Sequence, residues 1–187
     1  MAALVLWPFT SFAQPAASPQ RTIDNLNAAI QGEANASHRY KLFAEQADRE
    51  GNPQVAKLFR ATALAESIHE KDDEAVLRAM GLEPRPPVIE NVIVGTTREN
   101  LEAPIKAERN EEEKTYPAMI AEARREHVPA AAKSFAYAMN TEAEHARLFA
   151  NALANLGHNP PVDYYVGTVS GDTVTKPTGR EPYTKVE

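Results

Sequence analysis

The sequence predicts an all-α protein, a four-helix bundle built from two helical hairpins, followed by a short irregular or β-hairpin tail. Three observations indicate this fold. Apolar residues recur at helical spacing through four long segments, stop-and-restart signals divide these segments into two pairs, and the pairs are related by an internal repeat. The chain of 187 residues is long enough for one domain with its own core and a small appendage.

The first hairpin is predicted to consist of helices at residues 22–50 and 53–81. Each carries a stripe of apolar residues at steps of three and four, and Thr22 is a candidate N-cap. Between the helices, Gly51-Asn52-Pro53 combines a C-cap glycine, an N-cap asparagine and a proline at the first helical position. The two helices are therefore expected to run antiparallel.

The second hairpin is predicted to consist of helices at residues 97–126 and 129–156. The connection at 82–96 has 15 residues, which is far longer than a helical hairpin needs. Fully extended at about 3.3 Å per residue, it reaches roughly 50 Å. This is enough to return along a whole helix, so the second and third helices are expected to run parallel, joined by a long crossover.

The two hairpins are copies of one another. Matching positions lie 76 residues apart for the pairs Tyr40 and Tyr116, Glu66 and Glu142, and His69 and His145. Upstream, the offset between Glu33 and Glu108 is 75, so the second copy contains one additional residue. A helix absorbs such a residue most simply as a π-bulge, which we predict near Glu111. Pro104 and Pro117 are also expected to disturb this third helix.

The repeat gives every helix a carboxylate on its apolar face. A Glu-x-x-His spacing places both side chains on one side of a helix, and buried charges need a side-chain partner or a metal. One Glu from each of two helices plus Glu-x-x-His from each of the others is the pattern of di-iron and di-manganese bundles. Without metal, converging carboxylates would repel one another. The predicted metal ligands are Glu33, Glu66, His69, Glu108, Glu111, Glu142 and His145.

Some of these assignments keep an alternative. Glu111 is either a ligand or an exposed acid in the acidic run 111–113. Tyr40 and Tyr116 either donate hydrogen bonds to ligand carboxylates or are ordinary core tyrosines. Together with Glu111 they are the candidate catalytic residues. Two further acids, Asp72 and Asp73, are expected to be solvated, with a ligand-orienting role for Asp73 as the alternative. His38, His127 and His158 are expected to be surface residues.

Composition excludes several classes of function. The net charge of −6 gives no electrostatic reason to expect nucleic acid or an anionic membrane as partner. The absence of cysteine excludes disulfides, thiolate catalysis and iron–sulfur clusters. Residues 1–13 resemble a signal peptide and are too short to span a bilayer. We therefore expect an exported, periplasmic protein with a flexible lead-in at 14–21; a cytoplasmic protein with a disordered N-terminus is the alternative.

The sequence resembles the rubrerythrin family over nearly all of residues 22–157. The resemblance is carried by segments around the repeat: Asn25 to Glu33, Arg39 to Ala44, Glu50-Gly51, Leu58 to Ala63, Glu66-x-x-His69, Glu108-x-x-Glu111, Tyr116-Pro117 and Glu142-x-x-His145. It implies a ferritin-like bundle with two iron ions at a non-haem site held by the ligand set above, with manganese or a mixed pair as alternatives. It also implies a homodimer that reduces hydrogen peroxide, in which Glu111 and His69 exchange on one iron.

The tail at residues 158–187 departs from the family pattern. It resembles a rubredoxin-like module, the iron-binding unit that delivers electrons in rubrerythrins. Gly167 and Ser170 stand where the first pair of iron-binding cysteines would be, and Lys176-Pro177-Thr178-Gly179 resembles the second cysteine loop but has no cysteine. A coincidental hairpin is the alternative. Electrons are then expected from a separate protein or small reductant. A ferroxidase or iron-handling role using oxygen, and a metal-stabilised structural or partner-binding role, are the competing functions.

Overall fold

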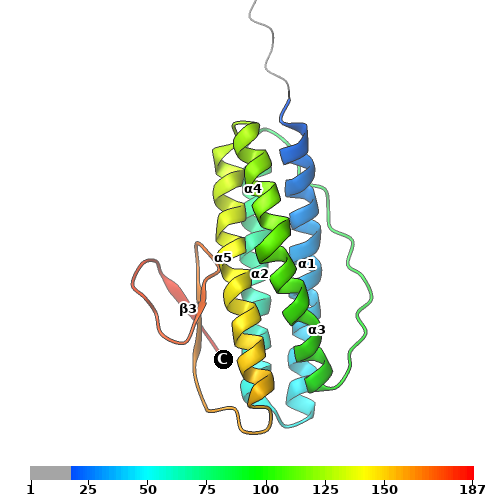
Figure 1. Ribbon diagram of the computed structural model, residues 1–187, viewed down its shortest axis with the longest axis vertical. Helices are drawn as coiled ribbons and strands as arrows, with labels where there is room; N and C mark the ends of the chain where they lie inside the picture. Colours follow the sequence, from blue (N-terminus) through cyan, green and yellow to red (C-terminus); the bar gives the residue numbers. More distant parts are fainter. Residues whose placement is uncertain (1–17) are drawn as a thin grey trace, which may run out of the picture.

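The computed structural model describes residues 18–187, which form an elongated four-helix bundle with a small sheet on one side (Figure 1). The helical elements in chain order are α1 (Gln20–Arg49), α2 (Pro53–Ala79), α3 (Thr97–Asn110), the π-helical turn η1 (Glu111–Thr115), α4 (Tyr116–Arg125) and α5 (Pro129–Ala154). Together α3, η1 and α4 make the third helix of the bundle. The predicted fold is confirmed, whereas the predicted signal peptide at 1–13 lies outside the described residues.

The first hairpin turns where the sequence predicts it. Gly51 has a φ of 75°, and Pro53 opens α2 at its first position. The prediction of Thr22 as N-cap is wrong, because α1 begins at Gln20 and Thr22 lies in its first turn. The backbone N–H of Thr22 donates instead to the carboxylate of Glu126, at 2.8 Å. An acceptor from the second hairpin therefore takes the place of a local cap.

The crossover at residues 82–96 runs along the outside of the bundle, so that α2 and α3 are parallel as predicted (Figure 1). Three amide side chains of α1, spaced one turn apart, accept backbone N–H groups of the crossover: Asn27 from Arg85, Gln31 from Val88 and Asn35 from Glu90, at 2.9 to 3.0 Å. Gln31 also donates to the carbonyl of Val88 at 2.7 Å. The extended segment thus obtains its hydrogen bonds from a helix face instead of a sheet.

The third helix contains the predicted irregularity. A π-helical turn occupies Glu111–Thr115, at the place where the repeat has its additional residue. Pro117 follows directly in the first turn of α4, where a missing N–H is tolerated. The expected disturbance at Pro104 does not end the helix, because α3 continues through this residue and loses one hydrogen bond at most.

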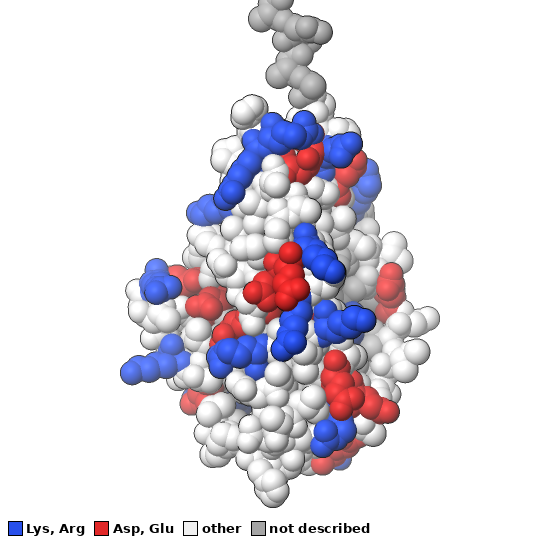
Figure 2. All heavy atoms as spheres, viewed as in Figure 1, with Lys and Arg blue, Asp and Glu red and all other residues white. Residues whose placement is uncertain are grey.

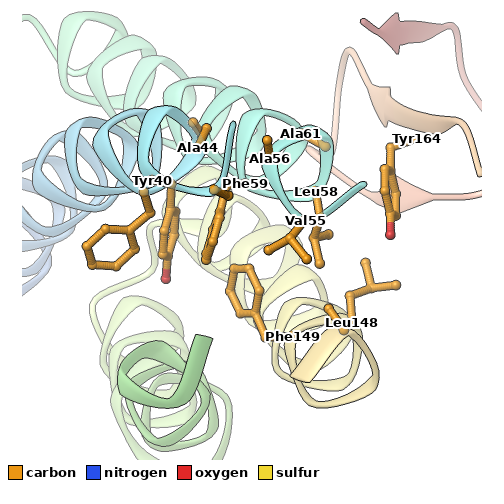
Figure 3. Close-up of a cluster of buried hydrophobic side chains, with 14 of the residues drawn as sticks. Tyr40, Ala44, Val55, Ala56, Leu58, Phe59, Ala61, Leu148, Phe149 and Tyr164 are labelled. Atoms are coloured by element: carbon orange, nitrogen blue, oxygen red, sulfur yellow. The ribbon is translucent and has the colours of Figure 1, made fainter. Parts of the chain in front are cut away.

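The core is divided into two hydrophobic clusters by a layer of charged side chains. One cluster lies toward the α1–α2 turn and contains the aromatic rings of Tyr40, Phe59 and Phe149, which pack together with centroids 5.3 to 6.0 Å apart (Figure 3). The other lies toward the α4–α5 turn, around Ile30 and Phe135. Along α1, α2 and α5 the buried acidic and histidine positions fall between the two clusters. The polar layer is therefore enclosed by apolar side chains at both ends.

The C-terminal tail forms a three-stranded antiparallel sheet of β1 (Tyr164–Gly167), β2 (Thr173–Val174) and β3 (Tyr183–Val186), in the order β2-β1-β3. Figure 1 shows this sheet packed against the α2 and α5 side of the bundle. Tyr164, Val166 and Val186 are buried in the first core cluster. The sheet is thus held by the bundle, as a segment too small for its own core requires.

On the face in Figure 2, acidic and basic side chains are interspersed over the middle of the molecule, and basic side chains are more numerous at its upper end. Within residues 18–187, no helix combines the length with the apolar character that a membrane span requires.

Candidate metal centre

Six side chains predicted as metal ligands meet in the layer between the two clusters. They come from all four helices of the bundle, and none is more than 5 % exposed: Glu33, Glu66, His69, Glu108, Glu142 and His145. Burial of so many ionisable groups is costly unless they are paired or bind metal. Their convergence is the arrangement that the duplicated sequence predicts.

The six side chains form two overlapping groups. In one, Glu33, Glu66, His69 and Glu142 each offer a ligand atom, and these atoms all lie within 4.8 Å of one another. In the other, the same holds for Glu66, Glu108, Glu142 and His145. Glu66 and Glu142 belong to both groups. This is the geometry of two neighbouring cation positions that share two carboxylates.

Both histidines direct Nδ1 toward the carboxylates. The Nδ1 atom of His69 lies 3.2 Å from Glu66, and that of His145 lies 3.1 Å from Glu142 and 3.2 Å from Glu66. The spacing of three residues within α2 and α5 brings each imidazole beside the Glu of its own motif. One imidazole is thus available to each of the two groups.

Because of the π-turn, the third helix directs side chains into the site both before and after the added residue. Glu108 precedes the turn and Tyr116 follows it, and both are buried, at 2 % and 4 % exposure. The hydroxyl of Tyr116 donates to Glu33, and the hydroxyl of Tyr40 donates to Glu108. Each tyrosine therefore contacts the carboxylate of the other hairpin, which is the first of the two roles considered from the sequence.

Burial and the close approach of charged groups shift the pKa values of all six side chains. Burial and neighbouring carboxylates raise the pKa of Glu33, Glu108 and Glu142. Burial also acts to raise the pKa of Glu66, but the two imidazoles outweigh it and lower that pKa. Burial acts to lower the pKa of both histidines, but the carboxylates outweigh it and raise them.

The donor set fits two divalent cations. Oε1 of Glu142 is buried and has no hydrogen-bond partner within the described part of the chain, although it is one of the shared carboxylates. A bound cation would give this oxygen a partner. It would also replace the protons on the carboxyl groups whose pKa values are raised. Carboxylate oxygens with imidazole nitrogens are donors that both iron and manganese accept.

Glu111 lies beside these two groups and belongs to neither. It is partly buried, and together with Glu33, Gly32 and Tyr116 it lines a cavity of about 70 Å³ between α1 and the π-turn. Burial and the carboxylates of Glu108 and Glu33 raise the pKa of Glu111 to about 8. Its environment is thus that of the site and differs from that of an exposed acid.

The structure corrects the expectation for Asp73. This residue was expected to be solvated, but it is 2 % exposed and accepts a hydrogen bond of 2.6 Å from Ser134. Burial raises its pKa to about 8. Its place on the apolar stripe of α2, one turn after His69, was the signal in the sequence that indicated burial. His127 and His158 are exposed as predicted, and His38 is partly exposed.

Sequence reasoning missed the residues that contact the outer nitrogens of the histidines. Nε2 of His69 lies 3.1 Å from the carbonyl oxygen of Ser170, and Nε2 of His145 lies 3.1 Å from Oγ1 of Thr173. Both partners belong to the C-terminal sheet. No spacing within the sequence predicts these contacts, because they depend on how the tail docks on the bundle.

Comparison with known proteins agrees with this geometry. Nigerythrin of Nitratidesulfovibrio vulgaris is 34 % identical over 128 residues, which cover 68 % of this chain and 63 % of that protein. A solved structure of nigerythrin in its fully reduced, all-ferrous state has a TM-score of 0.79 at 28 % identity, covering 93 % of this chain and 90 % of that one. The chain therefore has relatives that share both its bundle and its appended segment.

Rubrerythrin-2 of Clostridium acetobutylicum is 31 % identical over 157 residues, which cover 81 % of this chain and 84 % of that protein. The family model for rubrerythrin matches residues 24–153, which include every predicted ligand and stop before the C-terminal sheet. The chain therefore belongs to the rubrerythrin family of di-iron proteins.

Proposed function

We propose that the protein is a di-iron peroxidase that reduces hydrogen peroxide to water with electrons from an external donor. The observation that carries this proposal is the pair of buried ligand groups that share Glu66 and Glu142, in a chain of the rubrerythrin family. A protein of this activity serves in the defence against oxidative stress. The absence of cysteine means that the chain has no iron–sulfur centre of its own, so the electrons come from another protein or a small reductant.

The ligand assignment follows from the two groups. Glu66 and Glu142, which belong to both groups, would be shared by the two ions, Glu33 and His69 would hold one of them, and Glu108 and His145 would hold the other. Glu111, which lines the neighbouring cavity, would be the additional ligand. Iron is the expected metal by family, and manganese or a mixed pair would fit the same donors.

The reaction consumes two protons and two electrons for each hydrogen peroxide and yields two water molecules. With iron bound, the metal pair supplies the two electrons that reduce the O–O bond. The chain itself supplies proton donors at the cavity. While Glu111 is not bound to metal, its raised pKa of about 8 keeps it protonated near neutral pH, and it lines the cavity that we propose as the entrance for peroxide.

The tyrosines orient the carboxylates that are not shared. The hydroxyls of Tyr40 and Tyr116 hold Glu108 and Glu33 respectively, so these two carboxylates keep their orientation while protons move at the site. As in other members of the family, we expect a homodimer. The protein's location in the cell, exported or cytoplasmic, stays a prediction from residues 1–13.

The test loads the metal-free full chain with Fe(II) under anaerobic conditions and mixes it with peroxide or oxygen in a stopped-flow instrument. The proposal expects two irons per chain, oxidation by peroxide much faster than by oxygen, and repeated turnover with an added reductant. Glu66→Ala and Glu142→Ala should lose bound iron, whereas Glu45→Ala, at an exposed position of α1, should not. Faster oxidation by oxygen with accumulation of iron well above two per chain would instead indicate an iron-handling protein.

A further inference from the structure

The C-terminal sheet contacts both predicted histidine ligands on the side opposite the metal positions. The carbonyl of Ser170 faces Nε2 of His69, and the hydroxyl of Thr173 faces Nε2 of His145, each at 3.1 Å. Ser170 lies just before β2, and Thr173 is its first residue. Four residues of one loop and strand thus cover the outer edges of two imidazoles that come from different helices.

These contacts select one tautomer at each histidine. A carbonyl oxygen can only accept, so Nε2 of His69 must carry the hydrogen. The hydroxyl of Thr173 donates to the carbonyl of Gly171 at 3.2 Å, which leaves its oxygen free to accept from Nε2 of His145. With Nε2 protonated, Nδ1 of each ring is the nitrogen that can bind a metal, and it is the one that faces the carboxylates.

The backbone reaches His69 only because residue 171 is glycine. Gly171 has a φ of 73°, and a Cβ atom at this position would overlap Nε2 of His69. The loop also contacts α5, where the hydroxyl of Thr141 lies 3.3 Å from the carbonyl oxygen of Ser170. The close approach is therefore specified by the sequence of the tail.

A carboxylate, and not a metal, holds this loop in shape. Glu181 accepts the backbone N–H groups of Val169 and Ser170, at 2.7 and 3.0 Å, and the hydroxyl of Ser170. A Cβ atom on Gly167 would lie 2.6 Å from Cδ of Glu181. The carboxylate of Glu181 therefore occupies the space into which a side chain at residue 167 would project. Gly167 and Ser170 are the positions that match cysteines in the rubredoxin-like pattern. Glu181 therefore crosslinks the loop through hydrogen bonds where the pattern has metal ligands.

The sheet is fixed to the bundle at its other end. Tyr164 of β1 lies beside Leu58 of α2 at the edge of the core cluster (Figure 3). The carboxylate of Asp163 forms ion pairs with Lys57 of α2 at 3.2 Å and with Lys185 of β3 at 2.9 Å. Docking at this end places the loop over the histidines of the same chain.

We propose that the cysteine-free C-terminal sheet is a metal-free clasp that positions His69 and His145 for metal binding, with Thr173 and Glu181 as its positioning residues. The proposal rests on the metal centre of the proposed function and extends it to the tail. Outer hydrogen bonds of this kind fix the orientation of ligand histidines, and their loss typically weakens metal affinity by about 10- to 100-fold.

The test uses zinc, which is diamagnetic and has no redox chemistry, so it does not depend on peroxidase activity. In the zinc-loaded full chain, ¹H–¹⁵N NMR of the imidazoles should show slowly exchanging Nε2–H protons on His69 and His145. Thr173→Val should speed exchange at His145 and leave His69 unchanged, and Thr173→Ser should restore the slow exchange. Thr175→Val, at an exposed position of the same tail, is the matched control.

Glu181→Ala should speed exchange at both histidines, because the loop that carries Ser170 and Thr173 loses its acceptor for two N–H groups and one hydroxyl. The release of zinc to a chelator should be at least several-fold faster in Thr173→Val and Glu181→Ala than in Thr175→Val. Unchanged exchange at His145 in Thr173→Val, or unchanged zinc release in both variants, would overturn the clasp. A chain that binds zinc with these properties and does not turn over peroxide would overturn the proposed function alone.

Discussion

Replacement of Asp73 by asparagine should stabilise the metal-free protein, and more so at higher pH. Burial raises the pKa of Asp73 from 3.8 to about 8, so this residue must take up a proton to fold at neutral pH. At about 1.4 kcal/mol per pH unit, that uptake costs about 4 kcal/mol at pH 7 and about 2 kcal/mol at pH 5. Asparagine has a similar shape, keeps an oxygen for the hydroxyl of Ser134, and needs no proton.

Urea unfolding of the metal-free full chain at pH 5 and pH 7 measures this difference. The gain in unfolding free energy from Asp73→Asn should rise by roughly 2–3 kcal/mol between the two pH values, since stability from a raised carboxyl pKa is lost as pH increases. Asp72→Asn is the matched control, because Asp72 is only half-buried and should give a much smaller pH dependence. An equal gain at both pH values would refute the assignment of a buried, protonated Asp73.

Three further outcomes follow from the site. Tyr40→Phe and Tyr116→Phe should each lower the unfolding free energy by about 1–3 kcal/mol, measured with urea, because each leaves a buried carboxylate oxygen without its donor; no loss in either variant would contradict the contacts. At equal metal content, peroxide should oxidise the iron-loaded Gly32→Leu variant more slowly than Gly32→Ala. Gly32 lines the cavity and has open space around it, so a variant with leucine can fold and would have a narrower cavity. Equal rates would exclude this cavity as the entrance. Deletion of Glu113 should convert the π-turn to α-helix with the seven-residue spacing that separates Glu33 from Tyr40 in the first hairpin, so Glu108 and Tyr116 should still face the site and elemental analysis should find the metal retained. Loss of the metal would show that the π-turn itself is needed for binding.

The bundle and its charged layer could be predicted from the sequence because the two hairpins repeat the same pattern of apolar and charged residues. A single Glu-x-x-His motif is ambiguous, but the repeat of Glu66-x-x-His69 at Glu142 on equally apolar stripes leaves few other arrangements. The π-turn could be located for the same reason, since a shift of the repeat from 75 to 76 residues must be absorbed between Glu108 and Tyr116.

Contacts between segments that are distant in sequence could not be predicted. The N–H of Thr22 finds its acceptor on Glu126, and the amides of α1 bind a crossover that has no strand partner. The docking of the tail on His69 and His145 is of the same kind. Local patterns report periodicity and capping, whereas these contacts depend on how completed elements pack together.

The claim that two cations share Glu66 and Glu142 is tested most directly by an anaerobic Fe(II) titration of the metal-free full chain and of its His145→Ala variant. The native chain should bind two irons, whereas the variant should bind one tightly, because the group of Glu33 and His69 keeps its own imidazole. A single iron in the native chain, or two tight irons in the variant, would contradict the shared di-iron site.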